Sequence, residues 1–265
     1  TVKPIYGHQE GAEVGYNPHK PGRPSHAYHT VFLRTLRVAL DVEVRSGKEH
    51  AAGYGLDNLW RLWDRLAPGQ RAWLICGDAG FGNERVMSEC EARSQNYLFR
   101  QRSTPGVEQL IQMLECQSGW QRVREDWEGC EGELQLNGWT RRRRAVVFRR
   151  PIKRQASPGE VPLLEQGGVQ VQTGPLYEHV VLVTNLKENL LTLLQLYRQR
   201  ADVENAYDEL KNQWGWGGFT TRDLLRCQIA ARTVAQVYNW WNLFVRCADP
   251  TRAREAITSR PLLLY

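Results

Sequence analysis

The sequence lacks several patterns that would place it in other classes of protein. Its six cysteines form no Cys-x-x-Cys pair and flank no histidines at zinc-finger spacing, which argues against a disulfide framework or a zinc finger. No Gly-x4-Gly-Lys-Ser/Thr loop occurs, so nucleotide hydrolysis is not indicated. We interpret the thiols as reduced and mostly packed, which is typical of a cytoplasmic protein.

Long apolar runs are also missing. The chain shows no charged-then-apolar leader, and its nearest candidate for a membrane span, residues 234–245, is interrupted by Gln236, Asn239 and Asn242. We therefore predict a buried helix there and no membrane partner. A hydrophobic fraction of 42% over 265 residues is enough for one large or two modest folded domains.

Positive charge is in slight excess, with 35 Lys and Arg against 29 Asp and Glu. That balance suits a partner made of phosphates, although many basic proteins bind no nucleic acid. The densest positive run consists of Arg141, Arg142, Arg143 and Arg144. We predict DNA contacts for these arginines, and the alternative is a solvated strand whose arginine stems cover apolar surface. Trp139 and Phe148 lie nearby, so stacking on an unpaired base is a further, weaker interpretation.

The pattern of short elements predicts an α/β fold. We expect strands over residues 1–6, 31–44, 73–76 and 97–100, and helices over residues 56–66 and after residue 83. Residues 11–24 form a loop rich in Gly and Pro, which carries Lys20 and Arg23. We expect these two cations to follow a DNA backbone.

The sequence texture changes twice further along the chain. Short alternating segments separated by Gly- and Pro-bearing turns predict a β-rich insertion over residues 108–187, and helical periodicity dominates residues 190–245. We therefore divide the chain into a first part of the core over residues 1–107, the insertion, and a helical part of the core over residues 188–265. Residues 214–219 predict a helix stop with packing tryptophans.

Asp78 follows the apolar strand over residues 73–76 and is framed by glycines in the run GDAGFGNE. A carboxylate at the carboxyl end of a strand, with glycines beside it, can approach a ligand closely. The alternative is an ordinary turn or helix-capping aspartate, and the local sequence alone favours that alternative.

A second candidate carboxylate, Glu204, lies in a stretch with helical character. In one continuous helix, Tyr197, Arg200, Glu204 and Lys211 would share an arc of roughly 60°. A second stripe would pack on the core; its members are Val203, Tyr207, Leu210 and Trp214. The alternative is an amphipathic surface helix with an Arg–Glu pair that contributes about a few tenths of a kcal/mol.

The spacing Tyr197-x2-Arg200-x3-Glu204-x6-Lys211 matches the Y-R-E-K signature of insertion-sequence transposases. GDAGFGNE resembles the strand that carries their second catalytic aspartate, and residues 6–26 resemble the segment after their first. From residue 1 to beyond residue 241, the chain resembles bacterial transposases of the Asp-Asp-Glu (DDE) class, group 1. This resemblance implies an RNase H-like core interrupted by a β-rich insertion.

The resemblance also implies the chemistry. Members cleave DNA strands and transfer them at insertion-sequence ends, using carboxylates that hold two Mg²⁺ or Mn²⁺ ions per active site. It assigns catalysis and metal binding to Asp78 and Glu204, and contacts with DNA phosphates to Arg200 and Lys211. It assigns Tyr197 a DNA-contact or positioning role, for which the alternative is a core aromatic residue.

The first catalytic aspartate of the family lies about two residues before a threonine that Thr1 matches, so we expect it upstream of this sequence. Asp41 is the nearest substitute, and we interpret it as structural because it falls within the expected third strand. The implied partners are double-stranded DNA, from the element ends and the target, and a second copy in a synaptic homodimer. The implied location is the bacterial cytoplasm, with the nucleoid when DNA is bound.

Two other functions stay open at this point. A DNA-binding remnant without catalysis would fit the absent first aspartate, and an RNase H-like nuclease or resolvase would fit the carboxylates. The Y-R-E-K spacing favours a transposase over the nuclease. A tyrosine nucleophile would need the segment with His26, Tyr28 and His29, whose spacing does not suit histidine metal ligands.

Overall fold

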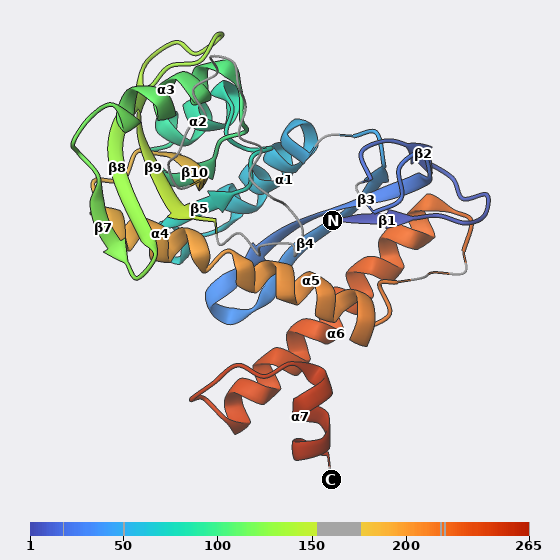
Figure 1. The fold of residues 1–265 in the computed structure, drawn as a ribbon. Coiled ribbons are helices and arrows are strands. Elements are labelled where there is room, and N and C mark those ends of the chain that lie inside the picture. The colour runs from blue at the N-terminus through green and yellow to red at the C-terminus, as the bar shows by residue number, and fades with distance from the viewer. Residues whose placement is uncertain (18, 50, 153–175, 218, 220, 265) are drawn as a thin grey trace, which may run out of the picture. The chain divides into compact units, whose positions relative to one another are not determined.

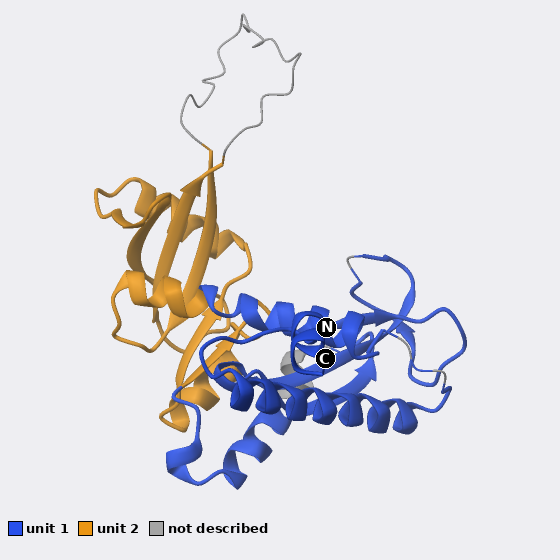
Figure 2. Ribbon diagram, turned by 90° about the horizontal axis from the view of Figure 1, so that it is seen from below, with its two compact units in different colours: residues 1–73, 198–265 blue, residues 74–197 orange. Residues whose placement is uncertain are grey.

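The computed structural model describes residues 1–17, 19–49, 51–152, 176–217, 219 and 221–264 (Figure 1). The chain forms two compact units, one of residues 1–73 and 198–265 and one of residues 74–197 (Figure 2). Each unit contains helices and its own sheet, so the predicted α/β class is confirmed.

The sheet of the first unit is built around strand β3 (Pro24–Leu33). It pairs antiparallel with β1 (Val2–Pro4), β2 (Glu13–Val14) and β4 (Val38–Ser46). The short helix η1 (Arg34–Leu36) turns the chain between β3 and β4. The β-branched alternation over residues 31–44 therefore predicted strand correctly, and the structure divides it into parts of two strands.

Four α-helices complete the first unit: α1 (Ala51–Arg65), α5 (Ala201–Gln213), α6 (Leu224–Ala248) and α7 (Ala256–Leu263), with the short helix η2 (Pro68–Gln70). The core joins β3 and β4 to α5 and α6 through Tyr28, Val42 and Tyr238. Asn239, one of the polar residues that interrupt the apolar run, exchanges two hydrogen bonds of 2.8 Å with the backbone of Ala39 in β4. The predicted helix is confirmed as part of α6, but the predicted burial holds for one face only, since Tyr238 and Val245 are buried while Trp240 and Phe244 are exposed.

In its described residues, the second unit contains a six-stranded sheet in the order β5-β6-β10-β9-β8-β7. Its strands are β5 (Leu74–Gly77), β6 (Asn96–Arg100), β7 (Gln121–Arg124), β8 (Trp127–Leu134), β9 (Arg143–Pro151) and β10 (Tyr177–Thr184). Its helices are α2 (Glu84–Ala92), α3 (Pro105–Glu115) and α4 (Leu190–Arg198). Strands β5 and β6 are parallel, and the other neighbouring pairs are antiparallel.

The domain boundaries differ from those expected from the sequence. Strand β10, from the predicted insertion, pairs with β6, so the β-rich segment extends the sheet that begins with β5. The units divide at residues 73/74 and 197/198 instead of near 107 and 187. Alternation predicts that a segment is a strand but does not reveal its partner, and an unpaired edge of β6 would leave backbone groups unsatisfied.

The predicted continuous helix through Tyr197, Arg200, Glu204 and Lys211 is interrupted. Helix α4 ends at Arg198 and α5 begins at Ala201, so the expectation of one shared arc for all four residues is wrong. The break coincides with the boundary between the two units. None of the described helices combines the length and the apolar character that crossing a lipid bilayer requires.

Candidate active site

Asp78 lies immediately after β5, at the start of the loop that leads to α2. Its Oδ1 accepts a hydrogen bond of 2.9 Å from the N–H of Gly80, while Oδ2 accepts none from any described residue. The side chain is exposed. Asp78 therefore combines both interpretations, because one oxygen closes a turn and the other remains available to a ligand.

The loop after Asp78 lies close to the sheet, and its glycines permit that close approach. A Cβ atom on Gly77 would lie 2.8 Å from Cβ of Phe81, and one on Gly82 would lie 2.5 Å from the carbonyl oxygen of Arg100. Asn83 then ends the loop, since its Oδ1 accepts the N–H of Val86 at 3.1 Å and caps α2. The glycines thus permit the approach that fixes Asp78 at the end of β5, and the predicted start of α2 is confirmed.

Glu204 lies in the first turn of α5, where a negative charge is favoured by the helix dipole. Its Oε1 is 2.7 Å from Nη2 of Arg200, and its side chain is 60% exposed. Lys211 lies in the last turn of the same helix, about two turns from Glu204, so these two residues still share a face. Burial lowers the pKa of Lys211 below its usual value, while Asp208 raises it.

Asp41 and the segment with Tyr28 are structural, as expected. Oδ1 of Asp41 lies 3.2 Å from Nη2 of Arg232, within the first unit. The side chains of Tyr28 and His26 are buried in β3, and the Tyr28 ring packs edge-on against Trp216. A buried tyrosine cannot reach a DNA phosphate, which agrees with the rejection of a tyrosine nucleophile.

Residues 1–260 match the model of the family "Transposase DDE domain group 1". The chain belongs to this family. None of the curated proteins compared with the chain matches it. Membership implies a transposase function, DNA as the substrate and an activity that depends on a divalent metal ion.

The donor chemistry of this DDE domain fits such an ion at each predicted carboxylate. Asp78 and Glu204 both present exposed carboxylate oxygens, which are the ligands that Mg²⁺ and Mn²⁺ prefer. Asp78 belongs to the second unit and Glu204 to the first. Among the described residues, no three His, Cys, Asp or Glu side chains gather into a metal site.

The position of Tyr197 disagrees with the DNA-contact role predicted for it. Its side chain is buried at the end of α4, in the core formed with Leu193 and Leu182. A DNA-contact role would require an accessible ring, so the core-aromatic alternative describes Tyr197 better. The exact four-residue spacing of the signature could not reveal that its first member is covered.

Arg143 corrects a second prediction. Its side chain, from β9, is only 3% exposed, and its guanidinium donates to Oε2 of Glu84 at 2.6 Å and to Oε1 of Glu91 at 2.8 Å. The hydrogen bond from Arg143 lowers the pKa of Glu84 to about 2. Glu84 and Glu91 lie at the two ends of α2, so the ion pairs of Arg143 link this helix to the sheet. The guanidinium is therefore not available to DNA.

The other three arginines of the run are also paired. Arg141 lies 2.5 Å from Glu91 and Arg144 lies 2.7 Å from Glu131, while Arg144 also donates to the carbonyl oxygen of Leu186 at 2.6 Å. Arg142 is the most accessible, with 73% of its side chain exposed and Glu133 at 3.9 Å. Within this run, the exposed Arg142 side chain is therefore the best candidate for a DNA contact.

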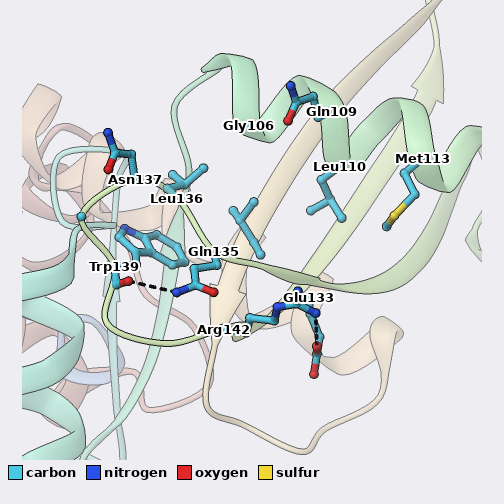
Figure 3. Close-up of a pocket in the computed structure, with 12 residues that line it drawn as sticks. Gly106, Gln109, Leu110, Met113, Glu133, Gln135, Leu136, Asn137, Trp139 and Arg142 are labelled. Atoms are coloured by element: carbon cyan, nitrogen blue, oxygen red, sulfur yellow. Dashed lines mark hydrogen bonds and ion pairs between the residues drawn. The ribbon is translucent and has the colours of Figure 1, made fainter.

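A groove of about 800 Å³ lies beside Arg142, between α3 and the loop that joins β8 to β9 (Figure 3). Leu110 and Met113 line it from α3, and Trp139 lines it from the loop. Trp139 is largely buried, with the Arg143 guanidinium 5.4 Å from its ring, and Phe148 is fully buried. The suggested stacking of a base on Trp139 or Phe148 is therefore contradicted.

Lys20 and Arg23, by contrast, are exposed on the loop between β2 and β3. Both approach Tyr6, an exposed aromatic residue that the sequence reasoning did not single out. The signal that could have identified this arrangement is the tetrapeptide Lys-Pro-Gly-Arg at residues 20–23, which is typical of a type II turn.

Proposed function

We propose that this chain cleaves and transfers DNA strands at the ends of a bacterial insertion sequence, with Asp78 and Glu204 as catalytic metal ligands. The observation that carries the proposal is the exposed Asp78 carboxylate at the end of β5, with Oδ2 unused, in a chain that matches the DDE family over residues 1–260. An RNase H-like core and a synaptic homodimer belong to the same proposal.

Three carboxylates, Asp78 and Glu204 among them, would hold two Mg²⁺ or Mn²⁺ ions, which would activate the attacking hydroxyl and stabilise the leaving oxygen when bound. Asp78 is prepared for this role because its turn hydrogen bond fixes Oδ1 and leaves Oδ2 unengaged. Glu204 carries an arginine as its counter-charge. A bound cation would take over that role at Glu204.

Arg200 and Lys211 would then act on the DNA. If Glu204 held a cation, the Arg200 guanidinium would leave its 2.7 Å pair with Glu204 and could donate to a phosphate oxygen. Lys211 presents its ammonium group on the same face of α5 as Glu204. Arg141 and Arg142 remain proposed contacts farther along the DNA.

Metal-dependent nicking of supercoiled plasmid that carries the element ends tests this proposal. The chain, and a version extended upstream through the expected first aspartate, are each compared with a Glu204→Ala variant. We expect Glu204→Ala to abolish nicking while folding and DNA affinity stay close to those of the parent, because the side chain is exposed and lies outside the core.

Asp202→Ala is the matched control. Asp202 is an exposed acid of the same helix turn, paired with Arg34 at 3.5 Å, and its loss removes the same charge. Unchanged nicking in Glu204→Ala would overturn the assignment. If both lengths bind DNA but neither nicks it, a DNA-binding remnant is the better description.

A further inference from the structure

The loop between β2 and β3 holds two cations at the ends of one tight turn. Pro21 and Gly22 occupy its central positions, Gly22 has a φ of 75°, and the N–H of Arg23 donates to the carbonyl oxygen of Lys20 at 3.2 Å. These features define a type II turn. The first and last Cα atoms of such a turn lie less than about 7 Å apart, so Lys20 and Arg23 are held as close neighbours.

Hydrogen bonds hold the backbone on both sides of the turn. Before it, Oδ1 of the buried Asn17 accepts the N–H of Lys20 at 3.1 Å. After it, the carbonyl oxygen of Pro24 accepts the N–H of Ile5 at 2.9 Å, next to Tyr6. The backbone therefore fixes the position of the two cations relative to Tyr6.

The two cations converge on the Tyr6 ring. Nζ of Lys20 lies 4.7 Å from the ring centroid, and Cζ of Arg23 lies 4.8 Å from it. Nζ of Lys20 also donates to the Tyr6 hydroxyl. Tyr6 is 64% exposed, so a hydroxyl, an ammonium and a guanidinium are presented together at the surface.

No carboxylate among the described residues lies within ion-pair distance of Lys20 or Arg23. Elsewhere in the same unit, cations have such partners; Nζ of Lys48, for example, lies 2.9 Å from Oε1 of Glu13. Two like charges held together without an acid repel each other, and an anion between them removes that repulsion. A bound anion would therefore supply the negative charge that Lys20 and Arg23 lack.

We propose that Tyr6, Lys20 and Arg23 form a binding site for one phosphate of the DNA backbone. The guanidinium donates in a planar fork, the ammonium acts as a point charge, and the hydroxyl supplies a third donor to the phosphate oxygens. The contact recognises the backbone and carries no base sequence. This proposal rests on the proposed function only in that DNA is the partner.

The test measures DNA binding in EDTA, where no cleavage occurs, by fluorescence anisotropy of a labelled duplex over a series of KCl concentrations. Each neutralised phosphate adds about 0.9 to the slope of log affinity against log salt concentration. We therefore expect Lys20→Ala/Arg23→Ala, which removes the contact with one phosphate, to lower the magnitude of this slope by about 0.9, equally for two duplexes of unrelated sequence.

The matched control is Arg45→Ala/Lys48→Ala. It removes the same charge from the same unit, but Arg45 lies 3.4 Å from Glu43 and Lys48 lies 2.9 Å from Glu13. We expect a clearly smaller change in slope. Tyr6→Phe is the second probe: it keeps the ring and removes the hydroxyl, so affinity should fall while the slope stays unchanged.

The outcomes separate this proposal from the proposed function. A parent chain that binds no DNA in EDTA contradicts the function itself. A parent that binds, together with a Lys20→Ala/Arg23→Ala variant whose slope equals that of the control, overturns the phosphate site alone. If the double variant fails to fold, the single variants Lys20→Gln and Arg23→Gln decide the question, each with an expected decrease in slope that is larger than that of the control and smaller than about 0.9.

Discussion

The arginine run at residues 141–144 and the turn at residues 20–23 differ in a way that their sequences conceal. The run has more positive charge, yet Arg143 is buried between Glu84 and Glu91, and its neighbours also face carboxylates. The turn has only two cations, and neither has an acidic partner among the described residues. The supply of nearby carboxylates, more than the number of cations, decides which basic segment is available to DNA.

The origin of those carboxylates explains why the difference is hidden. Glu84 and Glu91 lie 59 and 52 positions before Arg143 along the chain and reach it because α2 packs on the sheet that contains β9. Arg143 consequently stabilises the helix that follows the Asp78 loop. A basic run in a sequence therefore predicts DNA binding poorly when acidic helix faces elsewhere in the same unit can cover it.

The largest effect expected from this comparison concerns Arg143. Arg143→Met removes the guanidinium, so Glu84 loses its ion-pair partner while Glu91 keeps Arg141, and breaking a buried pair in this way costs about 3–5 kcal/mol. We expect a decrease of that size in the free energy of unfolding, measured by urea denaturation followed by circular dichroism.

Arg142→Met is the control, because Arg142 is exposed and its ion-pair partner Glu133 lies 3.9 Å away. Its effect on the free energy of unfolding should stay within about 0.5 kcal/mol. Equal effects of the two substitutions would contradict a structural role for Arg143 and would return it to the set of DNA contacts.

The pH dependence of stability sharpens the same comparison. The pKa of Glu84 is about 2 in the folded protein, against a usual 4.5, because Arg143 donates to its carboxylate. A lowered folded pKa contributes stability that is complete above pH 4.5 and is lost as the pH falls toward 2. Burial raises the pKa of Glu91, but hydrogen bonds from Arg143, Tyr97 and Arg141 outweigh it and lower the net value, so Glu91 acts in the same direction.

Denaturation midpoints measured across that acidic range test the prediction. The parent and Arg142→Met should lose stability steeply as the pH falls, whereas Arg143→Met should show a shallower dependence because Glu84 loses the hydrogen bond that lowers its pKa most. A slope for Arg143→Met as steep as that of the parent would show that other carboxylates govern acid unfolding.

Local patterns in the sequence predicted most elements correctly. Helical spacing predicted the body of α1, Asn83 marked the start of α2, and the alternation after residue 30 predicted strand. The pairing of β10 with β6 was not predicted, because strand partners are chosen by packing between distant segments. The break between α4 and α5 was missed because residues 197–204 contain neither Gly nor Pro.

The candidate site was also predictable from the sequence only in part. The glycines around Asp78 indicated a carboxylate held at the end of a strand, and the structure places Asp78 there with one oxygen in a turn. Whether an individual side chain is covered was not predictable, since Tyr197 and Glu204 belong to one spacing pattern but are buried and exposed respectively. Burial depends on which core each helix joins, and a spacing pattern does not contain that information.

The smallest expected effect comes from a substitution that gives the turn at residues 20–23 an acidic partner, as the arginines at residues 141–144 already have. Tyr6→Glu places a carboxylate where Lys20 and Arg23 converge, so both cations gain an acidic partner and become unavailable to a phosphate. The magnitude of the slope of log affinity against log salt concentration should fall by about 0.9, while stability changes by less than about 0.5 kcal/mol. Tyr16→Glu is the control: Tyr16 is 76% exposed on the same loop, the charge change is identical, and no cation of the described residues approaches its ring. If the two variants lower the slope equally, net charge alone governs DNA binding and the contrast between the two basic regions has no functional consequence.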